Sequence, residues 1–112
     1  MITTILPIKI ISTAYAGLNR FQLAAMNKAQ RATTKHALQA LAQPPAPPVT
    51  IVLTCNSPRA LDTDNLAGGF RAARDDVADW LGVDDGHPEL DWQYAQRCID
   101  PKTYEVEIEV IA

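Results

Sequence analysis

Two pairs of aspartates are the residues best suited to chemistry in this sequence. Asp62 and Asp64 stand two positions apart, so in an extended segment their side chains point the same way. Asp84 and Asp85 follow a predicted helix that spans about 24 Å. If the chain turns back along that helix, three carboxylates converge. Mg²⁺ prefers a few carboxylates together with waters and phosphate oxygens, so the spacing suggests a metal site acting on a phosphodiester.

Each of these aspartates also has an ordinary structural explanation. Asp64 precedes the predicted helix and suits its N-cap, and Asp62 can close an Asx-turn. The sequence Asp84-Asp85-Gly86 is common turn chemistry. Clustered carboxylates without a cation repel one another, which raises their pKa values. Spacing alone therefore leaves the metal and the capping interpretations open.

Charge is distributed unevenly along the chain. The net charge is −3, but residues 1–56 hold five basic residues and no acidic one, whereas residues 57–112 hold five basic residues and all 13 acidic ones. The two halves carry +5 and −8, which predicts a basic and an acidic surface on one molecule. A polyanion suits the first surface and a divalent cation suits the second.

The cations of the first half fall mainly on one predicted helix, residues 20–42, which begins with a capping-box pattern of Asn19 and Gln22. A helical wheel groups four of them: Arg20, Lys28, Arg31 and Lys35. Roughly opposite lies a stripe directed at a core: Leu23, Met26, Gln30, Ala37 and Leu41. The basic face suits a polyanionic ligand, although a solvated helix face is the usual explanation of the same pattern.

The whole pattern predicts an α+β fold, an α/β sandwich in which a small mixed β-sheet packs with two helices in the order β-α-β-α-β-β. Strands are expected at residues 2–11, where Pro7 breaks or ends the strand, and at residues 49–55, 90–98 and 104–112. The last strand alternates, which places its glutamates on a mostly exposed face. A second helix is expected after Asp64, ended by Gly82. Its apolar stripe is Leu66, Phe70, Ala73, Val77, Trp80 and Leu81.

Length and composition predict one domain over residues 1–112 in a soluble, cytoplasmic protein without a membrane span or signal peptide. Two cysteines, Cys55 and Cys98, do not make a disulfide framework or a four-cysteine zinc site. We expect these cysteines and His87 to be structural or incidental. The acidic residues of the second helix are expected to be solvated: Asp75, Asp76 and Asp79.

The order of elements and the motif Asp62-Thr-Asp64-Asn65-Leu66, joined by a helix to Asp84-Asp85, resemble the RusA-type Holliday-junction resolvases of bacteria and prophages. The resemblance covers nearly the whole chain, but only the segment around residues 62–85 is specific. It implies a homodimeric endodeoxyribonuclease, a hydrolase of DNA recombination and repair that cuts four-way junctions with Mg²⁺ or Mn²⁺. It further implies that Asp62, Asp64 and Asp85 are the catalytic metal ligands, with Asp84 as the near alternative to Asp85.

The sequence departs from this family at two places. The family has a lysine where this chain has Gly68, and its usually basic loop before the aspartates keeps only Arg59. Arg71 or Arg74 can supply a positive group from further along the helix. With the basic stripe of the first helix, Arg59 and Arg71 complete the set of expected DNA contacts. Two alternatives remain: a RusA-like module that binds DNA without cutting it, and a small structural or protein-interaction domain.

Overall fold

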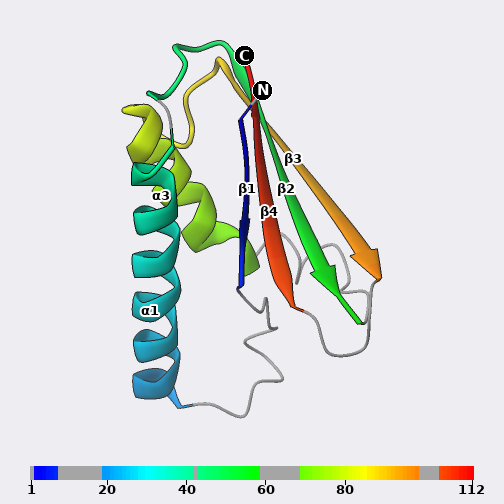
Figure 1. The fold of residues 1–112 in the computed structure, drawn as a ribbon. Coiled ribbons are helices and arrows are strands. Elements are labelled where there is room, and N and C mark those ends of the chain that lie inside the picture. Colours follow the sequence, from blue (N-terminus) through cyan, green and yellow to red (C-terminus); the bar gives the residue numbers. More distant parts are fainter. Residues whose placement is uncertain (1, 8–18, 42, 59–68, 99–103) are drawn as a thin grey trace.

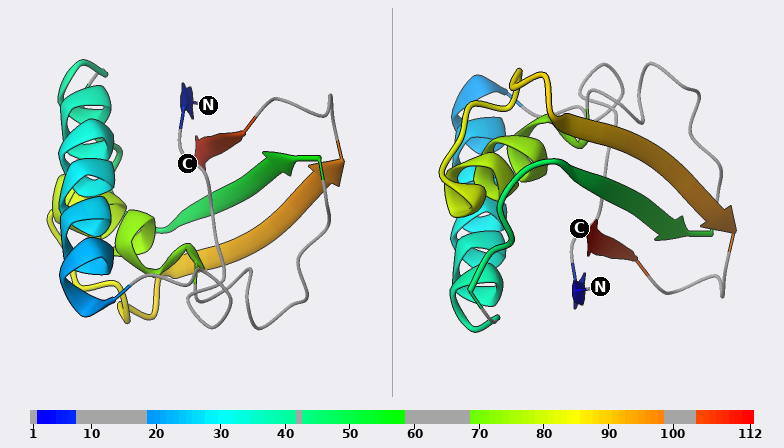
Figure 2. Two further views of the ribbon diagram at one scale, coloured as in Figure 1. Left: turned by 90° about the horizontal axis from the view of Figure 1, so that it is seen from below. Right: turned by 90° about the horizontal axis from the view of Figure 1, so that it is seen from above.

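A computed structural model describes residues 2–7, 19–41, 43–58, 69–98 and 104–112 of the chain. Its elements follow in the order β1 (Ile2–Leu6), α1 (Arg20–Gln39), β2 (Val49–Ser57), α3 (Arg71–Leu81), β3 (Leu90–Cys98) and β4 (Glu105–Ile111). The strands form one mixed sheet, and both helices lie on the same side of it (Figures 1 and 2). The α+β class and the order β-α-β-α-β-β are therefore confirmed. No helix in the described ranges is long and apolar enough to cross a membrane.

The strands lie in the order β1-β4-β2-β3, so the last strand of the chain is an inner strand. β4 pairs antiparallel with both β1 and β2, whereas β2 and β3 are parallel. A parallel pair needs a crossover connection, and α3 belongs to the one that joins β2 to β3. Register places Leu53 of β2 beside Ile108 of β4 and Tyr94 of β3.

Helix α1 begins with the predicted capping box. The Gln22 N–H donates to Asn19 Oδ1 at 2.9 Å, and the Asn19 N–H donates to Gln22 Oε1 at 3.0 Å. These two bonds satisfy amide groups that the first helical turn leaves without partners. Along the helix Thr34 and Leu38 are buried, and the Thr34 hydroxyl donates to the Gln30 carbonyl at 2.9 Å. Of the predicted inward stripe, Gln30, Ala37 and Leu41 are half-buried, and the side chains of Leu23 and Met26 are outside what the structure describes.

Helix α3 is described over Arg71–Leu81, and the predicted start after Asp64 lies outside the described residues. Phe70 stands at its N-cap without a side-chain hydrogen bond, and its ring is fully buried. The other end agrees with the prediction, because Gly82 adopts the left-handed conformation at φ 78° and its N–H closes the last turn. The predicted inward positions Ala73, Val77 and Leu81 are all buried.

The core lies between the sheet and the helices. It contains side chains from every strand and both helices: Leu6, Leu38, Val49, Ile51, Leu53, Cys55, Phe70, Val77, Leu81, Leu90, Val106, Ile108 and Val110. Alternate residues of β4 point to the other side of the sheet, where its three glutamates are half-buried rather than mostly exposed. The prediction for these glutamates was wrong because β4 is flanked by a strand on each side.

Candidate functional site

The structure locates one of the two predicted aspartate pairs. Asp84 and Asp85 lie in the turn between α3 and β3. Asp62, Asp64 and Arg59 fall outside the described residues, as does Gly68. Within the described ranges, no group of three His, Cys, Asp or Glu side chains is arranged to hold a metal ion. The predicted three-carboxylate site therefore stays a prediction, and its described part is the Asp84–Asp85 turn.

Arg74 of α3 is the cation beside Asp85. Its Nε lies 3.6 Å from Asp85 Oδ2, and its Nη2 donates to the Asp85 backbone carbonyl at 3.4 Å. The same carbonyl accepts a 2.9 Å hydrogen bond from the indole N–H of Trp92. The backbone of Asp85 is thus fixed from both α3 and β3. The side-chain pair is looser, since 3.6 Å is too long for a hydrogen bond.

Aromatic side chains hold Arg74 in this position. Its guanidinium lies over the Trp92 ring, 4.9 Å from the centroid, and its Nη1 donates to the Tyr94 hydroxyl at 2.7 Å. Tyr94 in turn stacks on Phe70, with the ring centroids 5.7 Å apart. A continuous set of contacts therefore runs from Phe70, which lies six residues after Asp64 in the sequence, to Asp85.

Asp84 is fully ionised at neutral pH and exposed. Its Oδ1 accepts a 3.1 Å hydrogen bond from the Gly86 N–H. This bond, followed by a hydrogen bond to Asp85, holds the pKa of Asp84 below its usual range. Asp84 therefore keeps the charged oxygen donors that a divalent cation needs, although the turn alone explains its bond to Gly86.

A shallow acidic groove includes this turn. It is lined by Arg31 of α1 and by residues of α3 and the segment that follows it: Asp75, Ala78, Asp79, Val83, Asp84 and Asp85. Among the described residues, four carboxylates thus share the groove with a single lining cation, Arg31. A second groove follows the basic side of α1 and is lined by Ala24, Lys28, Arg31, Ala32 and Lys35. Arg31 lines both grooves, so the basic surface and the acidic surface meet at this residue.

Arg31 is anchored by an ion pair between the two helices. Its Nε and its Nη2 each lie 3.1 Å from Asp76 Oδ1. The Asp76 side chain is completely buried, and its Oδ2 has no hydrogen-bond partner. Burial raises the pKa of Asp76, while the hydrogen bond and charge of Arg31 act in the opposite direction. The prediction that Asp76 is solvated was wrong, because α1 packs over this part of α3.

The other predicted DNA contacts are surface residues. Arg20, Lys28 and Lys35 are exposed on α1, and Arg71 is exposed at the start of α3. Arg31 alone in this set is half-buried, with 39% of its side chain accessible. Of the five predicted DNA contacts that the structure describes, four are thus exposed to a ligand. The fifth, Arg31, binds Asp76 and still keeps part of its side chain accessible.

Sequence reasoning missed Trp92 and Tyr94 and left Arg74 undecided. Their alternation on a strand places Trp92 and Tyr94 on one face, and Phe70 and Arg74 are one helical turn apart. Both spacings can be seen in the sequence. The sequence could not show that the aromatic side chains of β3 contact residues at the start of α3.

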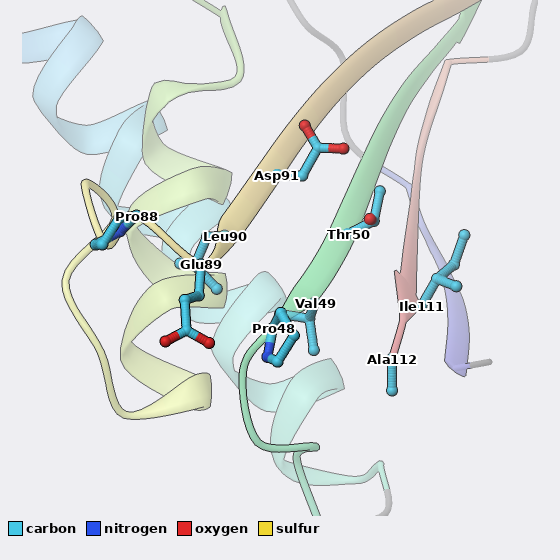
Figure 3. A pocket seen from close by; sticks show the side chains of 9 residues that line it. All are labelled: Pro48, Val49, Thr50, Pro88, Glu89, Leu90, Asp91, Ile111 and Ala112. Atoms are coloured by element: carbon cyan, nitrogen blue, oxygen red, sulfur yellow. The ribbon is translucent and has the colours of Figure 1, made fainter.

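Another hollow opens where β2 and β3 begin, and Figure 3 shows the side chains around it. Its charged lining residues, Glu89 and Asp91, are both acidic. This hollow therefore does not suit a polyanion.

Comparison with known proteins adds no functional assignment. No protein-family model matches the chain, and no curated protein matches it.

Proposed function

We propose that this chain is a RusA-type, metal-dependent endonuclease that cuts four-way DNA junctions. The observation that supports this proposal best is the position of Arg31, which lines the basic groove of α1 and also the acidic groove that holds Asp84 and Asp85. A DNA backbone bound along α1 would then lie next to those carboxylates at Arg31. Both surfaces were expected from the sequence, and a phosphodiesterase would use the basic one to bind the DNA backbone and the acidic one to hold a metal ion.

The basic groove suits a phosphate backbone in its chemistry. Lys28 and Lys35 are seven residues apart on one side of α1, which separates their backbone positions by about 10 Å. Ala24 and Ala32 also line the groove, so small side chains separate the long cationic ones. Such an interface draws its affinity from Lys and Arg contacts that displace counterions, and its binding weakens steeply with salt.

The acidic groove offers donors of the type that Mg²⁺ or Mn²⁺ accepts. Asp62, Asp64 and Asp85 would hold the ion, with Asp84 as the alternative to Asp85. The carboxylate of Asp84 is held ionised. The carboxylate of Asp85 is 3.6 Å from Arg74, so no short hydrogen bond from that arginine holds it. A cation bound there would act as a Lewis acid toward a phosphate oxygen. Arg74 is the described cation nearest Asp85, and it would take the place of the lysine that is replaced by Gly68.

Two subunits are part of this proposal. A four-way junction has two equivalent strands to be cut, and a two-fold dimer presents two equivalent sites. The resemblance to the RusA type implies a homodimer, and each subunit would supply its own carboxylates and its own α1.

The direct experiment is cleavage of a synthetic four-way junction in Mg²⁺. We expect paired nicks from the unmodified protein and loss of cleavage, with retained junction binding, in Asp85→Asn and in the double variant Asp62→Asn with Asp64→Asn. Asp79→Asn is the matched control, because Asp79 lines the same groove but is outside the predicted ligand set. Cleavage by Asp85→Asn at the rate of Asp79→Asn would exclude Asp85 as a ligand.

A module that binds DNA without cutting it is the second candidate. The observation in its favour is that Arg74 already lies beside the carboxylate of Asp85, where it competes with a cation. Junction binding by the unmodified protein, without cleavage in either Mg²⁺ or Mn²⁺, would favour this candidate. Equal failure to bind a junction and a duplex at low salt would exclude both and leave a structural or protein-interaction domain.

A further inference from the structure

Phe21 is a large apolar side chain exposed on a basic helix. It stands in the first turn of α1, and 74% of the residue is accessible, more than for any other large hydrophobic residue that the structure describes. Figure 1 shows these first turns of α1 beyond the ends of α3 and of the strands. A lone exposed hydrophobic residue is ordinary on a protein surface, so the neighbours of this ring decide whether it has a role.

Arg20 is the nearest of these neighbours. Its guanidinium carbon lies over the Phe21 ring, 5.3 Å from the centroid, within the range of a cation–π contact. The contact occupies one face of the ring and leaves the other face open, because most of Phe21 is accessible. The pair therefore presents a flat aromatic surface with a positive charge beside it.

The ring continues the basic groove of α1. Phe21, Lys28 and Lys35 follow one another at intervals of seven residues, so they lie along one side of the helix with about 10 Å between successive backbone positions. Every described residue that lines the groove belongs to α1, and Ala24 lies between the ring and Lys28. α1 contains no acidic residue. A line of cations thus ends at an exposed aromatic ring.

This combination suits a nucleic-acid strand better than a membrane. A helix that lies in a membrane surface needs a broad apolar face. Among the α1 side chains that the structure describes, Phe21 is the only large hydrophobic one that is exposed. Proteins that bind single strands, in contrast, combine a basic groove for the phosphates with aromatic rings on which bases stack. One ring beside several cations is enough for such a contact.

We infer that Phe21 stacks on an unpaired base of single-stranded DNA whose phosphates lie along Lys28 and Lys35. Bases in a duplex are already stacked on their neighbours, so the ring gains a contact only where a base is free. The inference goes beyond the proposed function, since it requires neither a metal ion nor cleavage, and it rests on that function only for the choice of DNA. In a junction the same contact would favour the branch point over continuous duplex.

Fluorescence anisotropy in EDTA tests the inference, because no metal-dependent cleavage occurs there. The probes are a labelled oligothymidylate and a labelled hairpin duplex with the same number of phosphates. We expect Phe21→Leu to weaken oligothymidylate binding about tenfold and to leave duplex affinity unchanged, since it removes the ring and keeps an apolar side chain. Phe21→Tyr keeps the ring and should bind as the unmodified protein does. Lys28→Ala should weaken binding of both probes.

Three results would overturn the inference: no binding of oligothymidylate by the unmodified protein, an equal effect of Phe21→Leu on both probes, or Phe21→Tyr binding as weakly as Phe21→Leu. Sedimentation with phosphatidylserine vesicles is a further arm. Vesicle binding that is lost in Phe21→Leu, with unchanged oligothymidylate affinity, would assign the ring to a membrane instead. Absence of junction cleavage in Mg²⁺ would contradict the proposed function and leave this inference standing, so the two failures can be distinguished.

Discussion

Replacing Arg31 by methionine is the most informative perturbation of the fold. It would leave the carboxylate of Asp76 buried without its only hydrogen-bond donor among the described residues, while its Oδ2 already has no partner. Breaking a fully buried pair in this way costs about 3–5 kcal/mol. Because 39% of the Arg31 side chain is accessible, solvent screens part of the interaction, and we expect a loss of about 2–3 kcal/mol at pH 7.5.

The free energy of unfolding lost in Arg31→Met should increase as the pH rises. Burial raises the pKa of Asp76 in the folded state, so the folded protein binds the proton more tightly than the unfolded chain does. The contribution of Asp76 to stability is therefore greatest below its unfolded pKa of 3.8 and is lost as the pH rises through the higher pKa of the folded state. Arg31 stabilises only the charged form. The difference between the unmodified protein and Arg31→Met should thus be large at pH 7.5 and nearly vanish below about pH 3.8.

Urea unfolding at both pH values measures this difference, and at pH 7.5 the midpoint should fall by about 1–2 M. Asp76→Asn is the matched control, since it removes the buried charge, and in its background Arg31→Met should cost much less. Such a double-mutant cycle isolates the pair. A loss below about 0.5 kcal/mol at pH 7.5, or the same loss at both pH values, would refute the assignment of a coupled buried pair.

Three further outcomes follow from the structure. Leu53→Ala should lower the free energy of unfolding by about 2–5 kcal/mol in urea titration, because Leu53 is fully buried on the central strand β2; a loss below about 1 kcal/mol would contradict this position. Gly82→Ala should cost about 1 kcal/mol from backbone strain at φ 78°, since an added Cβ meets no atom within 4 Å, and an unchanged thermal midpoint would be inconsistent with the left-handed C-cap. Lys28→Ala with Lys35→Ala should reduce the dependence of junction affinity on log salt concentration by about two, whereas an unchanged slope in a gel-shift titration would remove α1 from the interface.

Local patterns predicted the elements of the fold well. The strand at Leu90–Cys98 has the predicted bounds, and the capping box at Asn19 and the left-handed Gly82 are present as expected. These features depend on neighbours in the sequence, so a single chain is enough to read them. β2 continues to Ser57, two residues beyond its predicted end, because its pairing with β3 also continues to that residue.

Features set by tertiary packing could not be predicted in the same way. Asp76 has the composition and spacing of a solvated helix residue, and only the approach of α1 buries it. Arg74 was one of two undecided cations until Trp92 and Tyr94 fixed it beside Asp85. The glutamates of β4 looked exposed because alternation alone does not reveal whether a strand is at the edge or inside the sheet.

The central claim is that Asp62, Asp64 and Asp85 share one divalent cation. Paramagnetic broadening of backbone amide NMR signals by substoichiometric Mn²⁺ tests it without requiring cleavage. We expect the amides at residues 62–66 and 84–86 to broaden together, and both effects to disappear in Asp85→Asn but persist in Asp79→Asn. Broadening of one segment without the other, or an unchanged pattern in Asp85→Asn, would contradict a shared metal site.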